Sequence, residues 1–300
     1  MFVIKYKKIF FLISMIAVLA SVFSVIYFGL NFGIDFRGGS LLEVSFVGET
    51  PSFDELRLAL RERNIGEFSL RSSDHGSFIL RTPPIDEKGK EVLLEAMSLG
   101  GRFEAVEERF NFVGPIVGEE LKKKAWIAIG LSLIAIILFI AFSFRTVSKP
   151  VSSWIYGLVA ILALAHDIII PVGIFAVMGF LIGAEVDALF VMALLAILGY
   201  SINDTIIVFD RVRENLRKNQ ELHTKENFGE TVGRSLGQTF VRSINTSLTT
   251  FLVLVMLYFI GGEVTRNFAL VLMVGVIAGT YSSIFLASPL LVVMGKKASH

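Results

Sequence analysis

Six apolar runs, each close to the thickness of a bilayer, constrain the fold of this chain more than any other feature. They cover about residues 9–30, 125–144, 154–182, 188–209, 244–260 and 268–294. An α-helix needs roughly 20 apolar residues to cross the hydrocarbon core. Because 54% of the residues are hydrophobic and only 18% are charged, a soluble fold could not cover this much apolar surface. We therefore predict an α-helical integral membrane protein with six transmembrane helices.

Three of these runs are irregular. The third contains Pro171 and the sixth contains Pro289, so a tilt, a kink or an early end is expected in each. The fifth run is short, and its helix either spans with few residues or recruits residues before Ile244.

The distribution of Lys and Arg predicts the orientation of the helices. Fourteen lie in the two terminal tails and in the connections between the second and third and between the fourth and fifth runs. The two short hairpins on the opposite side, residues 183–187 and 261–267, contain only Arg266. Because basic loops stay in the cytoplasm, both termini are predicted to be cytoplasmic, in a multi-pass protein of the cell membrane.

The predicted domains follow from these runs. Residues 1–30 form a tail and the first helix, 31–124 an external domain, 125–294 helices two to six with a cytoplasmic loop at 211–240, and 295–300 a second tail. A cleaved signal peptide is the alternative for residues 1–30, since basic residues precede the apolar run there. The run is longer than the apolar region of most signal peptides, which favours an uncleaved anchor.

The segment 31–124 is the one long polar stretch. LLEVSF alternates like a strand, and SFDELRLALRERN reads as an amphipathic helix with Ser52 and Glu55 at the spacing of a capping box. FSLRSS and SFILRT read as paired strands, DEKGKEVLLEAM as a second helix and RFEAVEERF as a last strand. The order β-α-β-β-α-β predicts a small ferredoxin-like α+β domain.

The sequence lacks the common signatures of enzymes and of cofactor sites. There is no GxxxxGK[ST], GxGxxG, HExxH or GxSxG motif, no Cys, and only four His. The net charge of +1 and the lack of a basic stripe with stacking aromatics argue against nucleic-acid binding. We predict no enzymatic activity, no cofactor and no metal site.

Polar residues inside the spans are the strongest functional candidates. On the fourth span, Tyr200, Asn203 and Asp204 share a helix face, and Asp204 lies about 10 Å below the edge marked by Arg211. Carboxyl groups at this depth are unfavourable unless paired, protonated or wetted, so an intramembrane ionisable residue is a functional candidate by default.

The third span carries a second such pair, His166 and Asp167, near mid-membrane. His166 has the alternative of being a satisfied core histidine. Because burial favours the neutral carboxyl and a nearby guanidinium favours the anion, an Arg that approaches and leaves Asp204 would make its proton come and go. Asp167 and Asp204 are then two steps of a water-linked proton path.

The last two spans carry further patterned residues. Arg242, Asn245, Thr246 and Thr249 form a polar stripe on the fifth. Hydrogen bonding between helices, or for Arg242 an interfacial position, is the plainer alternative. On the sixth, the pattern of Gly275, Gly279 and Ser283 predicts close helix packing.

Two longer motifs carry a resemblance to a known family. They are GIDFRGGSLLEV at 33–44, with Gly33, Asp35, Gly38 and Gly39, and GYSINDTIIVFDRVREN at 199–215. AHDIIIPVGI at 165–174, RSINTSLTT at 242–250 and ALVLMVGVIAGTYSSIFLASPLL at 269–291 agree as well. The chain resembles the SecD/SecF family of protein-export membrane proteins, in the RND transporter superfamily, and INDT with FDRVREN favours its SecF branch.

The resemblance implies an RND-type half bundle that pairs with SecD and associates with the SecY/SecE/SecG channel, with YajC as a further candidate partner. It implies use of the proton motive force to assist preprotein translocation from the outer side of the membrane. It also implies that Asp204 and Arg242 belong to the proton path. SecD is not fused to this chain, so a separate subunit would complete the assembly.

Two other functions stay open. One is an RND-type exporter of small hydrophobic molecules, although an external domain of about 90 residues is small for a drug-binding porter. The other is a scaffold that stabilises the translocon without transporting protons. Replacement of Asp204 by Asn separates the proton-driven functions from the scaffold, because a scaffold should tolerate this substitution.

Overall fold

The structure is a computed structural model that describes residues 2–63, 65–66, 68–72, 76–143, 151–224 and 226–297. The chain forms two compact units. A helical unit comprises Met1–Asn31, Ile127–Glu185 and Leu189–His300, and a sheet unit comprises Phe32–Trp126 with Val186–Ala188. The loop between the second and third helices, with the predicted cytoplasmic Arg145 and Lys149, lies outside the described residues.

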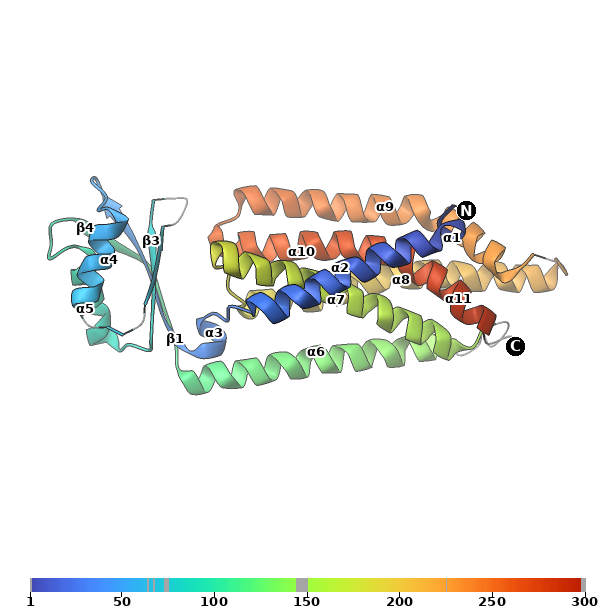
Figure 1. Ribbon diagram of the computed structural model, residues 1–300, viewed down its shortest axis with the longest axis horizontal. Coiled ribbons are helices and arrows are strands. Elements are labelled where there is room, and N and C mark those ends of the chain that lie inside the picture. Colours follow the sequence, from blue (N-terminus) through green and yellow to red (C-terminus); the bar gives the residue numbers. More distant parts are fainter. Residues whose placement is uncertain are drawn as a thin grey trace. The chain divides into compact units, whose positions relative to one another are not determined.

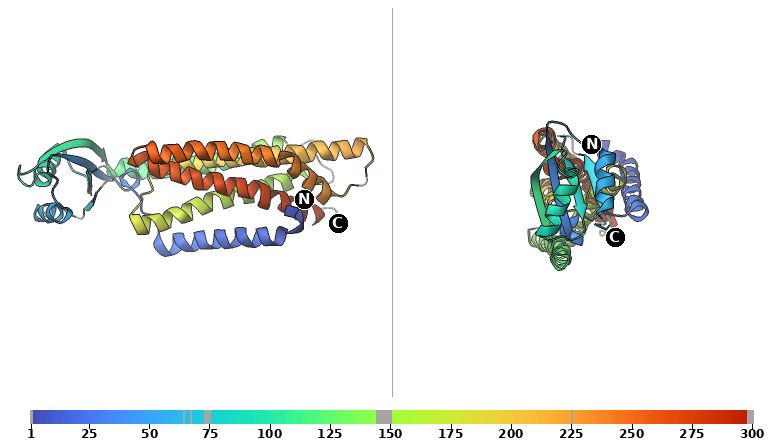
Figure 2. Two further views of the ribbon diagram at one scale, coloured as in Figure 1. Left: turned by 90° about the horizontal axis from the view of Figure 1, so that it is seen from above. Right: turned by 90° about the vertical axis from the view of Figure 1, so that its left-hand side faces the viewer.

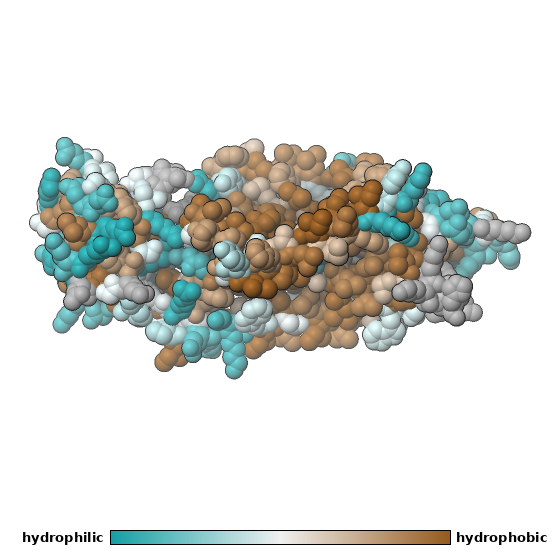
Figure 3. All heavy atoms as spheres, viewed as in Figure 1, coloured by the Kyte–Doolittle hydropathy of each residue, from teal (hydrophilic) through white to brown (hydrophobic). Residues whose placement is uncertain are grey.

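The helical unit confirms the prediction of six apolar helices long enough to cross a membrane (Figures 1 and 2). The first five are α2 (Lys7–Phe28), α6 (Pro115–Ser143), α7 (Ser153–Ile182), α8 (Ala188–Glu221) and α9 (Phe228–Ile260), and a short α1 (Phe2–Lys5) precedes them. The sixth is built from α10 (Glu263–Tyr281), a π-helix (Ser282–Ala287) and α11 (Ser288–Lys297). Apolar side chains cover most of the visible face of this unit (Figure 3). On α2, for example, Phe23 is 62% exposed.

Most of the segment 211–240, which is predicted to be cytoplasmic, is helical. α8 continues to Glu221 and α9 already begins at Phe228, so the fifth helix recruits residues before Ile244. Asn227 caps α9 in a capping box with Glu230. The two helices extend because buried polar side chains join them, with the Asn215 amide donating to the Ser235 hydroxyl at 2.8 Å.

The sixth span does not end at Pro289. A proline inside an α-helix removes one hydrogen bond and clashes with the carbonyl four residues earlier. Here the π-helix Ser282–Ala287 precedes Pro289, and the Ser288 hydroxyl donates to the Ser283 carbonyl at 2.9 Å. The wider turn accommodates the proline, and the helix continues as α11.

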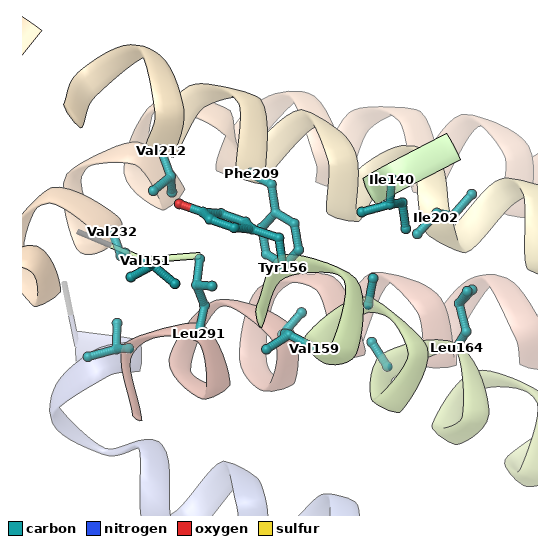
Figure 4. Close-up of a cluster of buried hydrophobic side chains, with 14 of the residues drawn as sticks. Ile140, Val151, Tyr156, Val159, Leu164, Ile202, Phe209, Val212, Val232 and Leu291 are labelled. Atoms are coloured by element: carbon teal, nitrogen blue, oxygen red, sulfur yellow. The ribbon is translucent and has the colours of Figure 1, made fainter. Parts of the chain in front are cut away.

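The core of the helical unit lies among α7, α8 and α11 (Figure 4). Tyr156 is fully buried at its centre, and its ring meets that of Phe209 edge to face at a centroid distance of 5.2 Å. Val212 from α8 and Leu291 from α11 complete the surroundings that Figure 4 shows.

The sheet unit has the predicted ferredoxin-like order of elements. These are α3 (Ile34–Arg37), β1 (Gly39–Val47), α4 (Phe53–Glu62), β2 (Ser69–Ser72), β3 (Phe78–Thr82), α5 (Glu87–Met97) and β4 (Glu104–Val113). The strands form an antiparallel sheet in the order β2-β3-β1-β4. Leu56 and Leu60 of α4 and Leu93 of α5 are buried against Leu42 and Leu80 of the sheet.

The predicted capping box of α4 is present. The Ser52 hydroxyl accepts from the Glu55 backbone N–H at 3.3 Å, and the Glu55 carboxylate accepts from the Ser52 N–H at 3.0 Å. These two bonds satisfy donors that a helix start leaves open, which explains why the helix begins at Phe53.

Candidate functional site

Asp204 lies inside the helical unit and not on its outer surface. It is 2% exposed, and its Oδ2 atom is buried without a hydrogen-bond partner among the described residues. A buried polar atom without a partner is costly. The Oδ2 atom of Asp204 therefore has unused hydrogen-bonding capacity, which binding of a proton would satisfy.

Hydroxyl groups lie beside this carboxyl. Ser247 of α9 interacts with Asp204, and its hydroxyl oxygen also accepts from Tyr200 at 3.2 Å and from Thr280 at 2.6 Å. The three hydroxyls join α8, α9 and α10 next to Asp204. Such a chain of donors and acceptors can pass a proton by reorientation.

Arg242 contributes charge without direct contact. It interacts electrostatically with Asp204, yet no ion pair within 4.0 Å joins these two described residues. Its side chain is exposed on the helical unit. In this arrangement the guanidinium stabilises the anionic carboxyl from a distance.

The predicted stripe on α9 lies on the outside of the helical unit. Arg242, Asn245, Thr246 and Thr249 are exposed, and Asn203 of α8 is exposed as well. Asn203 thus differs from Asp204, which is buried. Neighbouring residues of a helix lie about 100° apart, which is enough to place one inside and the other outside.

Asp167 sits in a different environment, with its carboxylate fully satisfied. It is 0% exposed, and its Oδ1 atom lies 2.8 Å from His166 Nδ1. Its Oδ2 atom accepts from the hydroxyls of Ser201 and Ser282, the latter at 2.7 Å. Asp167 therefore joins α7, α8 and the π-helix in a closed hydrogen-bonded cluster.

His166 is held on both sides. It is 4% exposed, and its ring stacks on that of Tyr281 with a centroid distance of 6.0 Å. This is the satisfied core position that the sequence left as the alternative. The part of the chain that the structure describes contains no cluster of three or more His, Asp or Glu side chains able to hold a metal ion.

The structure adds site residues that the sequence did not indicate. Ser201 and Ser282 bind Asp167, while Ser247 interacts with Asp204 and accepts from Thr280. Their partners are 33 to 115 residues away along the chain, as for Thr280 with Ser247 and Ser282 with Asp167. All four lie in the motifs at 199–215, 242–250 and 269–291, but nothing in those motifs assigned their partners.

The small residues of the sixth span face α8. A methyl group added at Gly275 would meet the Ile197 side chain, and one added at Gly279 would lie 3.0 Å from Ser201 Cβ. Ser283 is buried, and its hydroxyl donates to the Thr280 carbonyl at 3.1 Å. Close packing remains our prediction for these three residues.

The motif at residues 33–39 forms a compact junction in the sheet unit. The Asp35 carboxylate accepts from the Ala188 backbone N–H at 2.9 Å, and the Gly33 N–H donates to the Val186 carbonyl at 2.9 Å. Gly38 has φ +75°, and an added methyl group would lie 2.7 Å from Pro115 Cα. Gly39 has φ +142° and lies similarly close to the Thr82 carbonyl. Only glycine fits both positions without strain.

The chain matches two descriptions of known protein families. One is "Protein export membrane protein SecD/SecF, C-terminal", over residues 95–297. The other is the "SecD/SecF GG Motif", over residues 23–48. The two matches include both Asp167 and Asp204 as well as the junction at Asp35.

Relatives named protein translocase subunit SecF resemble it over nearly their whole length. That of Thermobaculum terrenum is 40% identical, covering 97% of this chain and 92% of the relative. That of Vibrio alginolyticus is 37% identical, covering 99% and 90%.

Solved structures of SecDF share the fold. The crystal structure of SecDF from Thermus thermophilus, described as a translocon-associated membrane protein, gives a TM-score of 0.83 at 32% identity. A SecDF structure in a super-membrane-facing form gives 0.64 at 34% identity. Each match covers 98% of this chain, which spans 38% of the SecDF chain.

Proposed function

Because this chain belongs to the SecD/SecF family of protein-export membrane proteins, we propose that it is the SecF-type subunit of a protein translocation complex that uses the proton motive force. Its relatives named protein translocase subunit SecF support the translocation role. The buried Asp204 carboxyl with an unpartnered oxygen is the observation that supports coupling to protons.

Two states of Asp204 would alternate in this function. When the carboxyl is neutral it needs no counterion and fits its apolar helix. When it is ionised, Arg242 is drawn toward it, since attraction between charges is strong where water is scarce. Proton uptake and release would thereby move α9 relative to α8. One proton crossing 100 mV supplies about 2.3 kcal/mol for this movement.

The exposed polar stripe supports a partner in the membrane. Polar and charged side chains at this depth are unfavourable against lipid and usually face another helix or a water-filled space. Arg242, Asn245 and Asn203 lie on the outside of this chain alone. We propose that a SecD-type subunit covers them and encloses the proton path between the two chains.

The asymmetry of basic residues supports the orientation. Both termini and the α8–α9 connection would face the cytoplasm, and the sheet unit would face the outer side. There it would act on preproteins that leave a SecY/SecE/SecG channel. YajC is a further candidate partner.

The test replaces Asp204 by Asn in the full complex and measures preprotein translocation in vesicles with and without an imposed proton gradient. We expect the gradient-dependent part of translocation to be lost, because Asn cannot release a proton. Asp210→Asn is the matched control. Asp210 lies six residues further along α8, is exposed, and pairs with Arg213 at 2.9 Å.

The control should keep its response to the gradient. If Asp204→Asn responds as the unmodified chain does, the carboxyl carries no proton and the scaffold function is favoured instead. If a sodium gradient, imposed without a proton gradient, stimulates translocation by the unmodified chain, the coupling ion is not the proton.

A further inference from the structure

The sheet unit carries a groove that the proton path does not use. It has a volume of about 460 Å³ and lies between α4 and the start of β2. Its lining residues are Phe53, Arg57, Arg61, Gly66, Phe68, Ser69 and Leu70. Phe53, Arg57 and Arg61 follow each other at steps of four residues, so they form one stripe on α4. The core-facing side of this helix is a different one, formed by the buried Leu56 and Leu60.

Two basic side chains line this groove. Arg57 and Arg61 are exposed, and neither forms an ion pair with another residue that the structure describes. Phe53 is 39% exposed beside them. Among the described residues, the groove thus combines two cations and aromatic surface, which suits a ligand that carries carboxylates between apolar side chains.

One side of the groove is lined by residues of the edge strand of the sheet. β2 is the outermost strand and pairs only with β3 among the strands of the described sheet. An edge strand offers backbone N–H and C=O groups to another extended chain, which can add to the sheet as a further strand. Ser69 and Leu70 belong both to this edge and to the lining of the groove.

We infer that the groove between α4 and β2 binds an extended, acidic segment of the preprotein by strand addition to β2. The inference rests on the proposed function and identifies the surface that contacts the substrate. Backbone hydrogen bonds to β2 make the contact independent of sequence. Arg57 and Arg61 favour acidic side chains on one side of the added strand, and Phe53 and Phe68 accept apolar ones.

Because the chain contains no cysteine, the test can introduce a single thiol at a chosen position. Ser69→Cys places a thiol in the groove, and Asn111→Cys places a matched thiol on β4, the opposite edge of the same sheet. Each full-length variant is assembled in vesicles with SecD and the SecY/SecE/SecG channel. A precursor is arrested during translocation, with single cysteines in an acidic segment, and a bifunctional maleimide then joins neighbouring thiols.

We expect Ser69→Cys to capture the precursor at least about fivefold more than Asn111→Cys, the ratio that corresponds to roughly 1 kcal/mol. Adding Arg57→Glu and Arg61→Glu should lower capture of the acidic segment about fivefold and raise capture of a basic one. The inference is wrong if both edges capture equally. It is also wrong if charge reversal has no effect, or if the captured chain is a second copy of this protein or SecD.

The same vesicles separate this inference from the proposed function. If translocation depends on Asp204 while Ser69→Cys captures nothing, only the groove assignment fails. If the unmodified chain does not stimulate translocation at all, the proposed function fails and the inference fails with it.

Discussion

At the scale of single residues, the two buried aspartates of the helical unit differ in how they are satisfied. Asp167 has partners on both carboxylate oxygens, whereas Asp204 has a buried oxygen without one. A fully bonded carboxylate stabilises one structure, and an incompletely bonded one can change its state. We therefore expect Asp167 to hold the helices together and Asp204 to exchange its proton.

Replacing Asp167 by Ala should destabilise the helical unit. Alanine has no acceptor for the hydroxyls of Ser201 and Ser282, so buried donors lose their partner and the cost should be about 1–3 kcal/mol. A lower apparent unfolding temperature of the purified protein in detergent would show it. Asp204→Ala is the comparison, and the loss it causes should be smaller. An equal loss in both variants would contradict the distinction.

Glu226, in the turn between α8 and α9, should make this turn sensitive to acid. Burial raises its pKa, but hydrogen bonds from Asn219, Arg234 and Thr231 and the charge of Arg234 outweigh this and lower the pKa below its usual value. The stabilisation is therefore present above the pKa of the unfolded state, about 4.3, and is lost as the pH falls through the lower folded value.

Hydrogen exchange of the backbone around residues 219–234, measured from pH 7 down to pH 3, should show this loss. Glu226→Gln should remove most of the pH dependence in this region. Glu230→Gln serves as a control at the start of α9. If protection stays constant to pH 3, Glu226 does not stabilise the turn as an anion.

The sequence identified Asp167 and Asp204 because charge at membrane depth is rare and easily noticed. Ser201, Ser282 and Ser247 were missed because a hydroxyl in an apolar helix can bond to its own backbone, and nothing in its neighbours tells the two cases apart. Only the packing of helices distant in sequence assigns their partners.

At the scale of elements, local sequence signals predicted where a helix starts better than how long it is. Ser52 and Glu55 fixed the start of α4 because a capping box acts within one turn. The sequence left the start of α9 open since residues 228–243 mix polar and apolar side chains, and hydropathy cannot reveal that Asn215 and Ser235 join this part to α8. Polar contacts between helices set how far both continue.

The crossing of α2 and α7 depends on Gly173. A methyl group there would collide with both the backbone and the side chain of Ser21. Gly173→Ala should therefore push the two helices apart and cost about 1–3 kcal/mol. Gly157→Ala is the control in the same helix, because nothing lies within 4 Å of the added methyl group.

The control should be neutral or stabilise by up to about 1 kcal/mol, since Ala favours helix more than Gly does. Apparent unfolding temperatures in detergent compare the two variants. Equal temperatures would show that α2 and α7 can separate at no cost.

At the scale of the whole molecule, the exposed polar stripe supports the proposal that a SecD-type subunit covers it. In the cysteine-free chain, Asn245→Cys should react with a water-soluble maleimide when the protein is purified alone. Co-expression with SecD should lower the rate of labelling at least about tenfold, because the partner excludes the reagent.

Leu252→Cys is the control on the same helix. Leu252 is 51% exposed on an apolar part of α9, so lipid or detergent should cover it whether or not the partner is present. Labelling of Asn245→Cys that is the same with and without SecD would place the partner elsewhere.

The π-helix of the sixth span has a geometric consequence for the whole bundle. Val271, Gly275, Gly279, Ser283, Ala287 and Leu291 are all buried. In an α-helix, each step of four residues overshoots a full turn by about 40°, so such a row would drift away from the interior. A π-turn holds more residues, so a step of four residues falls short of a full turn. This rotates the row part of the way back toward the interior. One irregular turn thus reduces the drift of a row about 30 Å long away from the interior.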